Sequence, residues 1–302
     1  LTENERQDYK LDINNKLYAL LNYSIFRQRS TPDLYSTAYQ YWINMNGLLS
    51  NSSSKQAEQI KRSNDDEVIK LYDNYLKLSK QISLYNEKPK EQLQQLGIDM
   101  IALDEQVALL ERELNAKVSG FSNDKKQYTY TDLTKGLNRH EVFIDIIALP
   151  LIDTASWNWT SELRYLVNIS SPKWDTPKHM VIENAEGLME LSHDYANRIH
   201  DNDELRLFID TSGCYYDQFW APIAKELKGV NKVYISLDGV YNNINLATLY
   251  NKETGKYLFE ELDIEIVNSA RSFIESKNKE PEQYEDLTAM LLGFPDYDHK
   301  PN

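Results

Sequence analysis

YISLDGVYNNINLATLY, residues 234–250, contains the features that predict the fold of this chain. It begins with a β-branched and aromatic run typical of a strand, which stops at Asp238 and Gly239. An Asn-rich turn follows, and the chain then resumes as an apolar segment. Continuous apolar runs such as Val233 to Leu237, separated by helical segments, predict strands covered on both faces. We therefore expect a largely parallel α/β sheet.

The segments on either side of this stretch continue the alternation of strands and helices. Ala185 to Ile199 and Tyr215 to Leu227 have the apolar spacing of helices. Short stretches rich in β-branched residues suit strands, and they are EVFIDIIAL (141–149), RYLVNIS (164–170), HMVIEN (179–184), RLFIDTS (206–212), KVYISLDG (232–239), DIEIVNSA (263–270) and TAMLLGFP (288–295). This part of the chain is predicted to be an α/β domain.

The first third of the chain has the pattern of helices. Apolar residues recur at turn spacing from Tyr9 to Arg27. Ser30 or Thr31 precedes Pro32, as expected for an N-cap followed by a first-turn proline. Two further helices are predicted on either side of a break at Pro89. Because their apolar residues repeat with the same 3-4-3-4 spacing, we expect an antiparallel hairpin with facing stripes, formed by Val68, Leu71, Tyr75, Leu78 and Ile82 and by Met100, Leu103, Val107, Leu110 and Leu114.

Bulk composition limits the classes of function. The chain has 302 residues, 41% of them hydrophobic, which is enough for a core and for two domains. Its net charge of -14 argues against direct binding to nucleic acid, because affinity for a phosphate backbone comes from Lys and Arg. No apolar run is long enough for a membrane helix, and the first residues, LTENERQDYK, are unlike a signal peptide. A soluble, cytoplasmic protein without a membrane partner is expected.

Several stretches together resemble the CHAT family of caspase-like cysteine peptidases, which are usually attached to tetratricopeptide helices. The family's strand, Asp-Gly, apolar turn and Leu pattern is similar to Ser236–Leu249. KYLFEELDIEIVNSARSFI (256–274) resembles its Tyr-Leu, acidic, strand, small-residue and helix sequence. TYTDLTKGLNRHEVFIDIIAL (129–149) resembles its helix followed by a Glu-led strand, and residues 38–82 resemble the helices that precede such domains. These motifs occur in the same order as in the family, and together they span nearly all of the chain.

The resemblance implies a fold and a domain division. The expected fold is helical hairpins, as terminal tetratricopeptide-like repeats, followed by a caspase-like three-layer α/β sheet domain. A polar stretch after Lys117 with Gly120 and Asn123 marks the boundary. The expected domains are a helical repeat-like domain at 1–120, a pseudo-caspase subdomain at 121–286 and the first strand of the active peptidase subdomain at 287–302.

One departure from the family decides the functional prediction. In these peptidases a His after one strand and a Cys after the next form the catalytic dyad, beyond the first strand of the active subdomain. That strand resembles Ala289 to Asp298 here, and the sequence ends four residues later. The dyad is therefore expected to lie outside these residues, and no catalytic, cofactor-binding or metal-binding residue is assigned. No cofactor is expected.

Individual side chains were weighed for chemistry of their own. Cys214, the single cysteine, follows a predicted strand and precedes a helix, a position that can lower a thiol pKa. Asp210 and Asp217 oppose the thiolate, so an incidental thiol is preferred over a nucleophile.

The histidines are given no ligand role; they are His140, His179, His193, His200 and His299. Asp238 and Gly239 are interpreted as a tight turn. The acidic runs NDDEV (64–68) and EELDIE (260–265) are interpreted as solvated faces, because neither matches a calcium loop.

Two functions follow from the sequence. The first is the non-catalytic portion of a CHAT peptidase, whose helices bind an activator or partner protein and whose sheet supports the protease subdomain, in a bacterial defence or regulated-proteolysis setting. An apolar strand at Met290 to Phe294 is also predicted to associate with a C-terminal peptidase fragment. The alternative is a non-enzymatic repeat scaffold that binds protein partners.

Overall fold

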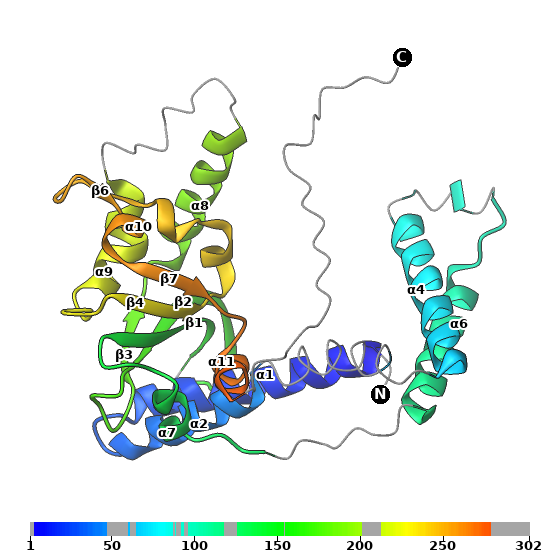
Figure 1. The fold of residues 1–302 in the computed structure, drawn as a ribbon, viewed down its shortest axis with the longest axis horizontal. Helices are drawn as coiled ribbons and strands as arrows, with labels where there is room; N and C mark the ends of the chain where they lie inside the picture. Colours follow the sequence, from blue (N-terminus) through cyan, green and yellow to red (C-terminus); the bar gives the residue numbers. More distant parts are fainter. Residues whose placement is uncertain are drawn as a thin grey trace, which may run out of the picture.

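The computed structural model describes residues 3–46, 60, 65–86, 88, 92–93, 96–117, 126–153, 155–200 and 213–278 (Figure 1). The α-helices are α1 (Glu3–Phe26), α2 (Pro32–Met45), α4 (Asp66–Asn86), α6 (Met100–Lys117), α7 (Tyr130–Lys135), α8 (Ala185–His200), α9 (Ala221–Ala224), α10 (Leu258–Glu261) and α11 (Ala270–Lys277). There are also a π-helical segment, η1 (Tyr216–Trp220), and two 3-10 segments, η2 (Gly239–Asn243) and η3 (Leu246–Thr248).

The strands form one main sheet and one small hairpin. They are β1 (Glu141–Ile152), β2 (Trp159–Ser170), β3 (Lys178–Ile182), β4 (Lys232–Ser236), β5 (Tyr250–Asn251), β6 (Lys256–Tyr257) and β7 (Asp263–Ile266). The main sheet has the order β3-β2-β1-β4-β7, and β5 pairs with β6. The strands predicted at 206–212 and 288–295 lie outside the described residues.

The sheet is mixed, so the prediction of a largely parallel sheet is wrong. β4 is parallel to β1 and to β7, whereas β2 is antiparallel to β1 and to β3. The cause is the short connection between Ile152 and Trp159, in which the Asp153 carboxylate accepts hydrogen bonds from Ala155 N at 3.1 Å and from Ser156 Oγ at 2.5 Å. A connection this short returns the chain only antiparallel, because a parallel crossover needs a dozen or more residues.

Side chains alternate between two cores along each central strand. On β1, Val142, Ile144 and Ile146 face a core shared with α8, η1 and α9. Phe143 and Ile147 face the opposite core, which is shared with α1, α2, α7 and α11. The sheet therefore lies between two helical layers, as Figure 1 shows, and the expectation of strands covered on both faces is confirmed.

α4 and α6 form the hairpin expected from the 3-4-3-4 spacing. Val68 and Leu114 are buried, and the other predicted seam residues are half-buried. Off the seam, Leu109 and Ile101 are exposed. An ion pair of 2.8 Å between Lys117 Nζ and Glu67 Oε2 joins the last turn of α6 to the first turn of α4, so the helices run antiparallel. Whether they are tetratricopeptide repeats stays a prediction.

The helical start of the chain packs on the sheet. Leu17 and Leu21 of α1 and Ile43 of α2 are buried in the same core as β1. α2 begins at Pro32 with Thr31 at its N-cap position, as predicted, although the Thr31 side chain makes no cap bond. The predicted helix at 215–227 is divided between η1 and α9, with a proline in the first turn of α9.

The chain leaves the sheet unit after α2 and returns beside the same point. Tyr128 N donates to Asn44 Oδ1 at 2.7 Å, and Asn44 Nδ2 donates to Tyr128 O at 2.8 Å. Arg271 Nη1 donates to the carbonyl oxygens of Asn44 and Lys126, at 3.4 Å in both cases. We call these contacts the neck.

The predicted boundary at residue 121 and the segment 287–302 lie outside the described residues, so the domain division stays a prediction. Across the described residues, no helix is both long and apolar enough to cross a membrane.

Candidate binding groove at the edge strand

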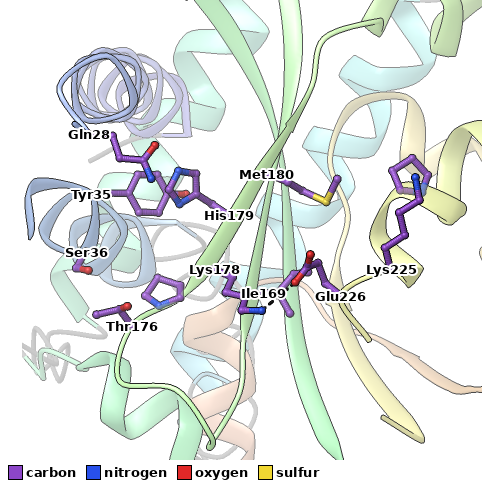
Figure 2. A pocket seen from close by; sticks show the side chains of 12 residues that line it. Gln28, Tyr35, Ser36, Ile169, Thr176, Lys178, His179, Met180, Lys225 and Glu226 are labelled. Atoms are coloured by element: carbon purple, nitrogen blue, oxygen red, sulfur yellow. Dashed lines mark hydrogen bonds and ion pairs between the residues drawn. The ribbon is translucent and has the colours of Figure 1, made fainter. Parts of the chain in front are cut away.

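A groove of about 650 Å³ runs along β3, with α2 on one side and α9 on the other (Figure 2). β3 lies at one end of the sheet order and pairs only with β2 among the described residues. Its backbone therefore has one edge that no described strand occupies. An edge strand flanked by two helices is a shape that can accept another extended chain.

An aromatic pair forms the α2 side of the groove. The rings of Tyr35 and His179 are stacked, with centroids 3.6 Å apart and an interplanar angle of 20°. Tyr35 Oη donates a hydrogen bond to Asn168 Oδ1 on β2. Burial lowers the pKa of His179, so its imidazole is neutral at neutral pH. Figure 2 shows the His179 ring lying against Tyr35, with Gln28 and Ser36 nearby.

Lysine side chains dominate the α9 side. Lys178 Nζ pairs with Glu226 Oε2 at 2.9 Å and lies 4.5 Å from the ring centroid of Trp174. A neighbouring hollow of about 360 Å³ shares Lys178, Lys225 and Glu226 with the groove. Lys173 and Lys228 also line that hollow. Four lysines and one glutamate thus line this hollow, in a chain whose net charge is -14.

A buried polar cluster lies on the same sheet face as Tyr35. Asp145 on β1 is fully buried, and its Oδ2 accepts a hydrogen bond of 2.9 Å from Trp42 Nε1 on α2. The pKa of Asp145 is raised to about 7, because burial outweighs the opposite effect of the Trp42 hydrogen bond. Asn168 is directly opposite Asp145 in the register of β1 and β2, and its buried Nδ2 has no hydrogen-bond partner among the described residues. Asp145 is closed to solvent in this conformation and joins β1 to α2.

Asp238 and Gly239 form the tight turn that the sequence indicated. Asp238 Oδ1 accepts from Gly239 N at 2.8 Å, and Oδ2 accepts from Ala148 N on β1 at 3.0 Å. Gly239 has a φ of +57°, and a Cβ there would lie 2.5 Å from Tyr165 Oη. Both observations explain why glycine follows Asp238. The aspartate thus fixes the end of β4. The amides of Gly239 and Ala148 already donate to its carboxylate, so they are not open to a ligand.

Cys214 lies just before η1 and is half-buried. Asp217, which was expected to oppose the thiolate, is paired with Lys252 Nζ at 2.9 Å, so its negative charge is partly offset. Asp210 lies outside the described residues. The interpretation of Cys214 as an incidental thiol stays a prediction.

The remaining sequence candidates have structural positions. His140 Nδ1 contacts Gly229 O at 2.9 Å in an exposed turn, His193 is exposed on α8, and His200 ends that helix. His299 lies outside the described residues. His179 is the histidine that sequence reasoning passed over, because its partner Tyr35 is distant in the chain.

The two acidic runs contribute to local structure. Asp65 Oδ1 accepts from Glu67 N at 2.9 Å at the start of α4. Asp263 and Glu265 both pair with Lys232 Nζ, at 3.2 and 2.9 Å. Within the described ranges, no group of three or more His, Cys, Asp or Glu side chains could hold a metal ion.

Comparison with known proteins adds one finding. The family model of the CHAT domain matches residues 212–301. Within the described residues, this match includes η1, α9, β4, the Asp238 turn, β7 and α11. The helical first third and the β1 to β3 part of the sheet lie outside it. No curated protein and no solved structure matches the chain.

Proposed function

Residues 212–301 carry a CHAT domain, which confirms the family resemblance, and on this premise we propose that the chain is the non-catalytic portion of a caspase-like cysteine peptidase. In this proposal its helices bind an activator or partner protein, and its sheet supports the protease subdomain. The reaction of the whole enzyme is hydrolysis of a peptide bond, in which a thiolate attacks the carbonyl carbon and a histidine transfers the proton. Backbone amides stabilise the oxyanion, and the reaction needs no metal.

The CHAT match is the observation that carries this proposal. It extends through β4, β7 and α11 to residue 301. β7 is at the opposite end of the sheet from β3, and among the described residues it pairs only with β4. The sheet thus offers an edge on which a protease subdomain, beginning with the strand expected at 287–302, can be built.

The surface of the hairpin supports a role in protein binding. Ile101 is 74% exposed and Leu109 is 62% exposed, and both are on α6. Leu84 on α4 is 51% exposed. In this proposal these exposed apolar side chains contribute to the surface that the partner protein covers. The identity of that partner, the bacterial setting and the cytoplasmic location stay predictions.

Selective alkylation of the purified chain tests the non-catalytic assignment. We would treat the chain with peptidyl chloromethyl ketones ending in Asp, Arg, Lys or Leu, and separately with iodoacetamide, and then measure the intact mass against 35.3 kDa. We expect an adduct with iodoacetamide only. Cys214 is the single cysteine, and a chain without a peptidase active site does not bind the peptidyl reagents next to this thiol. The Cys214→Ala variant should lose this adduct.

The peptidyl reagents provide the outcome that counts against the proposal. If one of them modifies Cys214 faster than iodoacetamide does, this chain holds a nucleophile and the non-catalytic assignment is wrong.

The alternative, a non-enzymatic scaffold, is separated from the peptidase proposal by what the coding sequence contains after Asn302. A further strand ending in His and another ending in Cys would complete the dyad of the family. A continuation made only of helices would favour the scaffold. Reading the coding sequence past this residue distinguishes the two.

A further inference from the structure

We propose that the groove along β3 binds an extended acidic segment of a partner protein, which adds to the sheet as a further strand. This goes beyond the proposed function, which assigns partner binding to the helices. The inference depends on the strand edge, on the two walls of the groove and on the charge around it.

The strand edge supplies the backbone partners. In the register with β2, Asn168 is opposite His179 and Val167 is opposite Met180. In an antiparallel pair, the N–H and C=O groups of alternate residues point toward the partner strand, and those of the residues between them point away. β3 therefore presents donors and acceptors along the edge that no described strand occupies, and a peptide in extended conformation can pair with them.

The walls of the groove differ in chemistry. His179 is on the sheet face of α2 and is stacked on Tyr35. Lys178 is on the other face with Trp174 and Glu226, and Met180 packs against the core on that face. Because side chains of an added strand alternate between the two faces, one set would contact the aromatic pair and the other would contact the lysines (Figure 2).

The charge selects an acidic occupant. Lys173, Lys225 and Lys228 are exposed, and Lys178 is half-exposed with its charge shared with Glu226. An acidic segment gains attraction from these lysines, whereas a second copy of this chain would bring the same lysines against them. Lysine beside an edge strand is a known means of preventing association between identical edges. The occupant is therefore expected to be a different polypeptide.

Fluorescence anisotropy with labelled peptides tests the proposal on the whole chain. The probe is a fluorescein-labelled eight-residue peptide of alternating Glu and Val, and the matched control alternates Lys and Val. We expect saturable binding of the Glu peptide, weakened as salt rises from 50 to 300 mM, and at least tenfold weaker binding of the Lys peptide. Equal binding of the two peptides, or none of the Glu peptide below 1 mM, overturns the proposal.

Backbone methylation separates strand addition from simple charge attraction. Two versions of the Glu-Val peptide carry N-methyl groups, either on every Glu or on every Val. A strand uses the amides on one of its edges to pair, so we expect one version to lose binding and the other to keep it. If both bind like the unmethylated peptide, the lysines attract the peptide without strand pairing, and the proposal is wrong.

Charge reversal locates the site. The variant Lys225→Glu with Lys228→Glu should bind the Glu-Val peptide about tenfold more weakly, since two exposed attractions become repulsions. The control reverses two exposed lysines away from the groove, Lys135→Glu with Lys256→Glu, and changes the net charge by the same amount. Equal weakening in both variants means that only net charge matters, which contradicts a groove.

Other occupants would give distinct results. Dimers of the free chain in sedimentation velocity, lost on charge reversal at residues 225 and 228, would assign the edge to a second copy. Tighter binding of an eight-nucleotide single-stranded RNA than of the Glu-Val peptide would assign the lysines to nucleic acid. Either result overturns the proposal.

Discussion

Asp145 places a carboxyl group in the middle of the sheet, where water cannot reach it. The side chain is 0% exposed and has Trp42 Nε1 as a hydrogen-bond donor to one oxygen. A buried charge with few donors is costly, and this is why the pKa of Asp145 rises to about 7. The residue joins β1 to α2 and makes folding sensitive to pH.

Asp145→Asn should remove that sensitivity. The pKa of Asp145 is 3.8 in an ordinary environment and about 7 when folded, so the folded state binds this proton more tightly than the unfolded chain. Its contribution to stability is fully present below pH 3.8 and is lost as pH rises toward 7. The loss amounts to about 4 kcal/mol, because each pKa unit corresponds to about 1.4 kcal/mol.

Urea unfolding between pH 4 and pH 8 measures this effect as the difference between the natural chain and the variant. The free energy of unfolding of the variant should increase relative to that of the natural chain as pH rises. This difference should become constant above pH 7. A difference that stays constant across this range would show that Asp145 does not titrate with a raised pKa.

Residue-scale contacts were the part least accessible from the sequence. Trp42 and Asp145 are far apart in the chain, as are Tyr35 and His179. The spacing of apolar residues within one segment does not predict contacts between such distant residues. Gly239 was different, since an Asp-Gly pair after an apolar run predicts a turn from neighbouring residues alone. The candidate groove could not be predicted, because it combines α2, β3 and α9.

At the scale of elements, the hairpin and the sheet are stabilised by separate cores. Val68 and Leu114 belong to a small cluster of the hairpin, whereas β1 contributes to the two large clusters around the sheet. The apolar spacing in α4 and α6 predicted their shared seam well, because the contacts depend on a repeat within each helix. The direction of β2 was missed, because it depends on the short connection between Ile152 and Trp159 and not on the strand pattern.

Leu114→Ala should destabilise the hairpin and leave the sheet unaffected. Leu114 is 3% exposed, and truncating a buried leucine costs about 2 to 4 kcal/mol. Leu109, 62% exposed on the same helix, is the matched control, and Leu109→Ala should cost less than about 0.5 kcal/mol.

Hydrogen exchange is the appropriate measurement, since it reports each element separately. Amides of α4 and α6 should lose protection in Leu114→Ala, while those of β1 and β4 keep it. Equal loss in the sheet would mean that hairpin and sheet unfold as one unit.

At the scale of the whole molecule, the hairpin is an excursion from a unit that includes the start of the chain. Asn22 Nδ2 donates to Pro150 O at 2.8 Å, and Arg164 Nη2 donates to Asn22 Oδ1 at 3.0 Å, so α1 is joined to β1 and β2. The sequence predicted a division into a helical domain and a sheet domain at residue 121, which lies outside the described residues, so that division stays a prediction. Composition changes near residue 120, but it contains no information on which face of the sheet receives α1 and α2.

Replacing residues 47–125 by a Gly-Ser linker of about eight residues should leave the sheet unit folded, because Asn44 and Lys126 already lie beside one Arg271 side chain. A variant that lacks residues 1–46 should instead aggregate, since it exposes the sheet face covered by α1 and α2. Circular dichroism with thermal unfolding compares the two. A soluble, cooperatively folded variant without residues 1–46 would contradict this account and support the division predicted at residue 121.

The neck also determines how movement passes through the molecule. Both chain segments that lead to the hairpin are held at one place, by Asn44, Tyr128 and the Arg271 side chain. A load applied to the hairpin would therefore pull on these hydrogen bonds beside α11, at the margin of the sheet. None of the residues of the neck belongs to a strand, so such a load would act on α2 and α11 before it acts on the pairing between strands.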